Sequence, residues 1–156
     1  MGKILLIEDK GIVANEIKKK LQKEIEINEN DIIDCYNSTS AIGAWGKYKD
    51  EVDCIILDLN IDSKGLRKEL GDKTVDEYYL VPGILLLKIF EKDKDRIEIC
   101  EKTIIHSAYL DTLEKKPMMQ ESFYNKLIQI SKLEGISIFD TVDDVKVILT
   151  KKKKSV

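Results

Sequence analysis

Short apolar runs alternate with amphipathic stretches along most of the chain. The runs Lys3–Ile7 and Val52–Leu57 are almost continuously apolar and rich in branched side chains. This pattern is typical of strands that are covered on both faces of a parallel sheet. Shorter apolar runs predict three more strands, at residues 31–35, 102–108 and 136–139.

Between these runs, apolar residues recur at helical spacing. Val13, Ile17 and Leu21 predict a helix from about Gly11 to Glu24. Other helices are predicted at about 41–45 (after the N-cap oxygens of residues 38–40), 84–90 (after Pro82-Gly83), 118–133 (after Pro117) and 142–149. Because strands and helices alternate, we expect an α/β fold with one doubly wound parallel sheet of five strands and right-handed crossovers.

Residues 61–81 interrupt this alternation. The segment is polar, contains Gly65 and Gly71, and carries a capping-box pattern at Thr74–Glu77. It is longer than an ordinary strand-to-helix loop, and long loops are often functional or mobile. We therefore expect an irregular or partly helical insertion at the edge of the sheet, which serves as a mobile lid or as a partner surface.

Composition narrows the class of protein. The chain has 156 residues, 43% hydrophobic and 35% charged, with a net charge of −3. We expect one domain over residues 1–150, a basic tail at 151–156, and no charge-driven nucleic-acid binding. The N-terminus leaves no room for a signal peptide, and no apolar run approaches the roughly 20 residues of a membrane span. Cys35, Cys54 and Cys100 read as buried, reduced thiols, so we expect a cytoplasmic protein without membrane contacts.

The candidate chemistry lies where two of the predicted strands end. The first strand runs into Glu8-Asp9 and the third into Asp58. Because open α/β sheets place their sites at the carboxyl ends of the strands, neighbouring strands would bring three acidic groups together. Such groups repel one another, and a divalent cation relieves that repulsion.

These acidic residues, followed by Ser107-Ala108 after the fourth strand, resemble a response regulator receiver domain of the CheY-like, two-component type. The resemblance spans nearly the whole chain and implies a flavodoxin-like sheet of order 2-1-3-4-5. It also implies that Asp9 and Asp58 bind Mg²⁺ directly, Glu8 through water, and Asn60 through its backbone carbonyl. Asp58 would accept a phosphoryl group from a histidine kinase or phosphotransfer protein, and Ser107 would hydrogen-bond to that group.

One departure from the family pattern leaves the function open. The family's fifth strand ends in Lys-Pro, but here Phe139 or Asp140 lies nearest the place of the lysine. Lys116-Pro117 follows Ser107 too closely to replace it. The loss of this cation puts phosphorylation-driven switching in doubt more than metal binding.

Two hypotheses follow. The first is a stand-alone response regulator receiver domain in a phosphorelay, phosphorylated at Asp58 and signalling through protein contacts. The second is a pseudo-receiver, which acts as a protein-interaction module independently of phosphorylation. Neither is an enzyme beyond self-phosphorylation and autodephosphorylation at Asp58, and we expect a monomer or weak homodimer. A phosphohydrolase is disfavoured, because Asn60 stands where that class needs a general acid.

Overall fold

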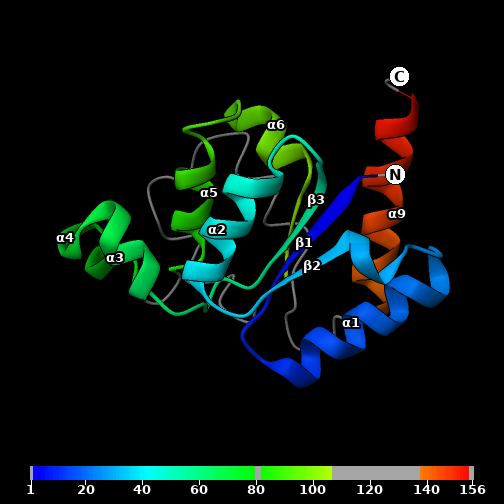
Figure 1. The fold of residues 1–156 in the computed structure, drawn as a ribbon, viewed down its shortest axis with the longest axis horizontal. Coiled ribbons are helices and arrows are strands. Elements are labelled where there is room, and N and C mark those ends of the chain that lie inside the picture. Colours follow the sequence, from blue (N-terminus) through cyan, green and yellow to red (C-terminus); the bar gives the residue numbers. More distant parts are fainter. Residues whose placement is uncertain (1, 80–81, 107–137, 155–156) are drawn as a thin grey trace.

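The computed structural model describes residues 2–79, 82–106 and 138–154. Its centre is a parallel sheet of order β2-β1-β3-β4 (Figure 1). The strands are β1 (Lys3–Ile7), β2 (Ile32–Cys35), β3 (Val52–Leu57) and β4 (Thr103–Ile105). The predicted α/β class and the predicted order of the first four strands are confirmed.

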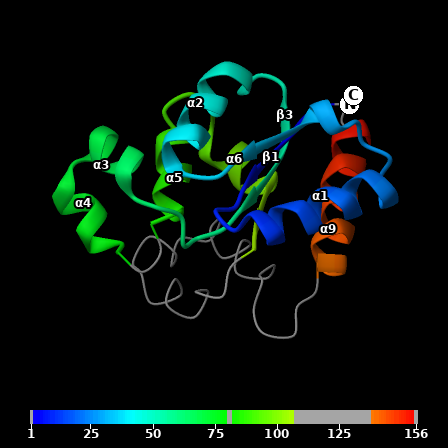
Figure 2. The same cartoon turned by 60° about the horizontal axis from the view of Figure 1, so that its bottom comes forward.

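Alternate residues of each strand pack into two different cores. Figures 1 and 2 show α1 (Gly11–Glu24) and α9 (Ile138–Lys154) on one side of the sheet, and α2 (Ser38–Tyr48) and α5 (Ile84–Phe90) on the other. Leu5, Ile7, Ile55, Leu57 and Ile105 face α2 and α5, whereas Ile4, Leu6, Cys54, Ile56 and Ile104 face α1 and α9. Both faces are therefore covered, as the apolar strands predict.

The helices agree with the sequence pattern in their positions and differ at their ends. The bounds of α1 and α5 are those predicted. Helix α2 begins at Ser38, and its N-cap is Asn37, whose side chain accepts the N–H of Ser40 at 2.7 Å. The oxygens of residues 38–40 were expected to supply this cap, but only Ser40 takes part, by accepting the N–H of Asn37 at 3.2 Å.

The insertion contains two short helices, α3 (Lys64–Leu70) and α4 (Asp72–Glu77), as the partly helical expectation requires. Thr74 does not begin a helix, so the capping-box interpretation of 74–77 is wrong. Helix α4 starts at Asp72 and has Gly71 as its N-cap residue. Leu66 and Val75 are buried in the core beneath α2 and α5, which anchors the insertion to the domain.

The sequence pattern did not predict α6 (Arg96–Glu101) or the 3-10 turn η1 (Glu29–Asp31). Asp95 caps α6 by accepting the N–H of Ile97 at 2.8 Å, and this aspartate was the available signal. The predicted helix 118–133 lies outside the described residues, as do residues 136–137 of the fifth strand.

Ile138 and Phe139, which the fifth strand was also expected to contain, instead begin α9. This helix replaces the predicted one at 142–149 and continues through Lys151–Lys154, so the part of the expected basic tail that the structure describes is helical. Among the described residues, no helix combines the length and the apolar character needed to cross a bilayer.

Candidate functional site

Three carboxylates meet at the carboxyl ends of β1 and β3. The two strands are paired in parallel, with Ile7 opposite Leu57, so Glu8, Asp9 and Asp58 leave the sheet at the same edge. One oxygen from each carboxylate lies within 4.8 Å of the others. The expectation that the three acidic residues lie together is confirmed. We call these three residues the acidic cluster.

Backbone hydrogen bonds hold the first residues beyond both strands in line with the sheet. The N–H of Asp58 donates to the carbonyl of Ile7 at 2.9 Å, and the N–H of Glu8 donates to the carbonyl of Cys35 at 3.1 Å. Each bond extends strand pairing by one residue, into the acidic cluster. The ladder thereby fixes the backbone from which Glu8 and Asp58 project.

The acidic cluster is only partly open to solvent. Glu8 and Asp58 are 1% and 4% exposed, whereas Asp9 is exposed. Although Asp9 is exposed as a residue, its carboxyl group is partly desolvated; this desolvation, and next the nearby charge of Asp58, raise the pKa of Asp9 above its ordinary value. A cation at this place would favour the ionised forms.

The loop that follows β3 touches the cluster through Asn60. Its N–H donates to Oδ1 of Asp58 at 3.1 Å, and Asn60 itself is exposed to solvent. This bond orients the Asp58 carboxylate. The resemblance to receiver domains implies a role for the carbonyl of Asn60, and the bond from its N–H is an additional contact.

The chain returning from the insertion passes close to the same loop, which the sequence pattern did not predict. The N–H of Gly83 donates to the carbonyl of Leu59 at 2.7 Å. A Cβ atom at position 83 would lie 2.5 Å from the carbonyl oxygen of Asp58 and 2.8 Å from Cα of Leu59. Only glycine fits here without a shift of the backbone. Gly83 therefore allows the chain after the insertion to lie directly against the loop after β3, beside the acidic cluster.

Of the other residues singled out in the sequence, Ser107 lies outside the described residues. Phe139 and Asp140 lie in the first turn of α9. His106 is buried, and its Nδ1 is 3.1 Å from Oγ1 of Thr141 on α9, so this ring is engaged with the helix layer.

The acidic cluster fits a magnesium ion by its donor chemistry. Mg²⁺ prefers oxygen ligands, usually one or two carboxylates together with water or phosphate oxygens. Glu8, Asp9 and Asp58 offer three carboxylates at compatible separations, and after desolvation the charge of Asp58 contributes to the raised pKa of Asp9. These residues could therefore hold the ion.

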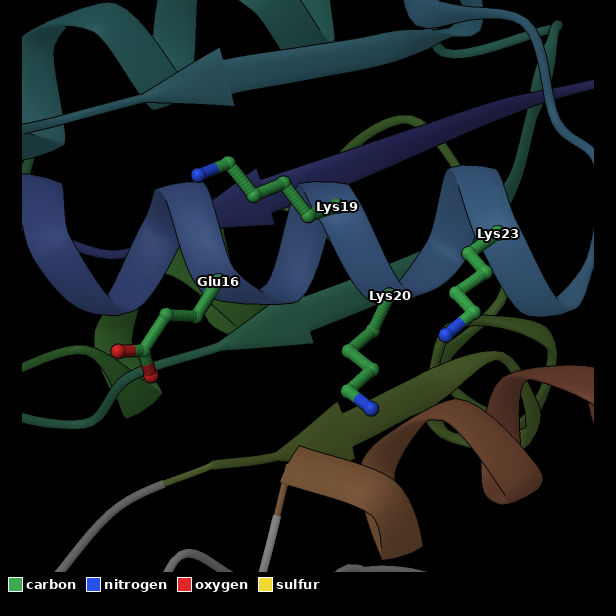
Figure 3. Close-up of a pocket in the computed structure, with 4 residues that line it drawn as sticks. All are labelled: Glu16, Lys19, Lys20 and Lys23. Atoms are coloured by element: carbon green, nitrogen blue, oxygen red, sulfur yellow. The ribbon is translucent and has the colours of Figure 1, made fainter.

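The structure also contains a pocket beside α1. It is lined by Glu16, Lys19, Lys20 and Lys23 (Figure 3). All four side chains come from one helix, and Figure 3 shows Lys19 pointing away from Lys20 and Lys23. Because the cationic groups do not converge on one point, this pocket does not form a binding site comparable to the acidic cluster.

Comparison with solved structures identifies the fold. A response regulator receiver domain protein from Clostridium thermocellum matches 100% of this chain and 100% of its own, with a TM-score of 0.64 and 16% identity. A Francisella response regulator receiver domain matches with a TM-score of 0.61 and 20% identity, covering 97% of this chain and 99% of that chain. No family model and no curated protein matches the sequence. The chain therefore has the fold of receiver domains.

Proposed function

We propose that this protein is a response regulator receiver domain that accepts a phosphoryl group on Asp58 in the presence of Mg²⁺. The observation that carries the proposal is the acidic cluster at the carboxyl edge of a receiver fold, with one oxygen of each residue within 4.8 Å of the others. The donor is a histidine kinase or a phosphotransfer protein. The output passes through protein contacts.

The chain's own groups account for the acceptor step. The Asp58 carboxylate attacks the phosphorus of a phosphohistidine; an O–P bond forms, the P–N bond breaks, and the imidazole leaves. The N–H of Asn60, 3.1 Å from Oδ1, fixes the orientation of the carboxylate before the attack. Asp58 is 4% exposed, so few water molecules solvate its carboxylate and have to be displaced before the attack on phosphorus.

Glu8, Asp9, Asp58 and the carbonyl of Asn60 are the proposed protein ligands of Mg²⁺. When bound, the ion supplies positive charge that offsets the charge of the carboxylates and of the phosphoryl oxygens. We propose that Ser107 hydrogen-bonds to the phosphoryl group. In this function the protein is not an enzyme, except for self-phosphorylation and autodephosphorylation at Asp58.

The second candidate is a pseudo-receiver, a protein-interaction module that is independent of phosphorylation. The observation that favours it is the absence of a lysine from residues 136–141, where the sequence pattern predicted the end of the fifth strand and the resemblance to receiver domains implies a lysine. Without that cation, fewer groups stabilise a transferred phosphoryl group. Metal binding at the acidic cluster is compatible with either candidate.

A phosphotransfer assay separates the two. The protein is incubated with a small acyl phosphate, with Mg²⁺ or with EDTA, and intact mass reports the addition of one phosphoryl group. We expect the mass increase only with Mg²⁺ and only in the native sequence, and not in Asp58→Asn. If the native protein binds Mg²⁺ by calorimetry but is never phosphorylated, the pseudo-receiver is the correct function.

A further inference from the structure

A buried serine joins the loop after β3 to the start of α2. Ser38 is fully buried. Its N–H donates to Oδ1 of Asp62 at 2.8 Å, and its hydroxyl donates to Oδ2 at 3.2 Å. The hydroxyl oxygen in turn accepts the N–H of Gly65 at 2.9 Å. Both carboxylate oxygens of Asp62 thus accept hydrogen bonds from the first residue of α2, and Oδ2 also accepts the N–H of Lys64 at 3.1 Å.

The backbone around this contact is closely packed. A Cβ atom at position 65 would lie 2.8 Å from the backbone nitrogen of Thr39 and 3.0 Å from Oγ of Ser38. Glycine therefore lets the first turn of α3 lie directly against the first turn of α2. The insertion is fastened to α2 at the point where Asp62 and Ser38 meet.

Both ends of this contact lie close in sequence to residues that contact the acidic cluster. Asn60 lies in the loop of Asp62, and its N–H donates to Oδ1 of Asp58 at 3.1 Å. Ser38, the first residue of α2, lies three residues after Cys35 at the end of β2, whose carbonyl accepts the N–H of Glu8 at 3.1 Å. The bond between Asp62 and Ser38 consequently links the backbone beside Asp58 to the backbone beside Glu8.

We propose that Asp62 is a positioning residue for the acidic cluster. Through Ser38, it holds the loop after β3 in the conformation that keeps Asn60 against Asp58. The inference rests on the proposed function, because it assigns Asp62 a role in binding Mg²⁺ and in orienting the phosphoacceptor. Hydrogen bonds to an ionised carboxylate are stronger than neutral ones, so this contact is suited to ordering the exposed residues of the loop, Asn60 and Asp62, between the buried Leu59 and Ile61 and the start of α3.

Capping of α2 does not account for Asp62. The helix already has Asn37 as its N-cap, with Ser40 completing a reciprocal capping box. A residue that only supported the helix terminus would change the stability of the protein and leave Mg²⁺ affinity unaltered. A positioning residue changes both the order of the Asn60 loop and the affinity for the ion.

The test compares three variants of the full chain. Asp62→Glu keeps the charge but moves the carboxylate, Asp62→Asn removes the charge but keeps the shape, and Asp72→Asn removes an exposed charge elsewhere in the insertion, where Asp72 pairs with Arg67 at 3.2 Å. Mg²⁺ affinity is measured by calorimetry. Exchange of the Asn60 amide is measured by NMR in EDTA, and melting temperatures report on folding.

We expect Asp62→Glu and Asp62→Asn each to weaken Mg²⁺ binding about tenfold, the usual scale for residues that orient metal ligands. Exchange at the Asn60 amide should also become faster, and Asp72→Asn should match the native protein. Native-like affinity in Asp62→Glu, with weak binding only in Asp62→Asn, would show that Asp62 acts by charge alone and would overturn the proposal. So would lower melting temperatures with unchanged affinity and exchange.

Two other outcomes are possible, and each has its own measurement. If Asp62→Glu does not fold, Ser38→Ala replaces it; this variant loses the hydroxyl bond to Asp62 at 3.2 Å and the acceptor of the Gly65 N–H, keeps the bond from the Ser38 N–H to Asp62, and should also speed exchange at Asn60 and weaken Mg²⁺ binding. If the native protein binds no Mg²⁺, the proposed function fails in its metal requirement. Amide exchange then decides alone: faster exchange at Asn60 supports the positioning role, and unchanged exchange rejects it.

Discussion

Two buried regions of the domain, the core under α2 and α5 and the acidic cluster at the ends of β1 and β3, have contrary effects on stability. In the core under α2 and α5, the rings of Trp45 and Phe90 stack with centroids 4.3 Å apart, and both are almost fully buried. In the acidic cluster, the buried groups Glu8 and Asp58 are carboxylates. Burial stabilises the first region and destabilises the second. The contrast shows which part of the molecule supports the fold and which part is kept for function.

Truncation in the aromatic core should have the largest effect. Phe90→Ala removes a fully buried ring that stacks on Trp45, and we expect a loss of about 3–5 kcal/mol in the free energy of unfolding. Urea denaturation measures this loss. Ile97→Ala, at a side chain that is 53% exposed, is the control and should cost far less. Equal losses in the two variants would contradict the core assignment.

Removal of a charge from the acidic cluster should have a smaller effect of opposite sign. Two unit charges about 4 Å apart interact by about 1 kcal/mol in water and about 4 kcal/mol near a protein surface. We therefore expect Asp58→Asn to raise the free energy of unfolding in EDTA by on the order of 1 kcal/mol and to weaken Mg²⁺ binding. Asn at this position can still accept the N–H of Asn60.

The control for this substitution is Asp143→Asn, which removes an exposed charge on α9 that lies 4.0 Å from Lys146. It should leave both the metal-free stability and the response to Mg²⁺ unchanged. If Asp58→Asn lowers metal-free stability and leaves the Mg²⁺ response intact, the three carboxylates do not act as one site, and Asp58 is an ordinary loop residue.

Addition of Mg²⁺ to the native protein should change the free energy of unfolding by less than the Asp58→Asn substitution does. Binding to the folded state alone stabilises it by RT ln(1 + [L]/Kd), which is below about 1 kcal/mol when the ion concentration is comparable to Kd. Thermal melts with Mg²⁺, compared with NaCl at equal ionic strength, measure this shift. A shift of the same size in Asp58→Asn would indicate general screening of charge instead of binding at the cluster.

The sequence predicted the sheet well because its strands differ so clearly from the rest of the chain. The runs at β1 and β3 are almost continuously apolar and are followed by carboxylates, so both the buried strands and the acidic cluster could be anticipated. Helix α1 was equally clear, since its buried residues Ala14, Ile17 and Leu21 follow helical spacing.

The contacts around the insertion could not be predicted, because they depend on residues brought together from distant segments. Nothing local in the sequence pairs Asp62 with Ser38, or places Gly83 against Asp58. Helix α6 was missed because its six residues carry too short an apolar pattern, and α4 was given the wrong start because a capping-box pattern also occurs within helices.

The smallest predicted effect is the pH dependence that Asp9 contributes in EDTA. Burial, and then the charge of Asp58, raise the pKa of Asp9. A carboxyl group with a raised pKa stabilises the folded state below its unfolded pKa of about 3.9, and this contribution is lost as the pH rises through the folded pKa. Asp9→Asn should therefore match the native protein at low pH and exceed it in free energy of unfolding at neutral pH. In an Asp58→Asn background this difference should shrink without vanishing, because burial is the larger cause; a difference that grows toward low pH would contradict the assignment.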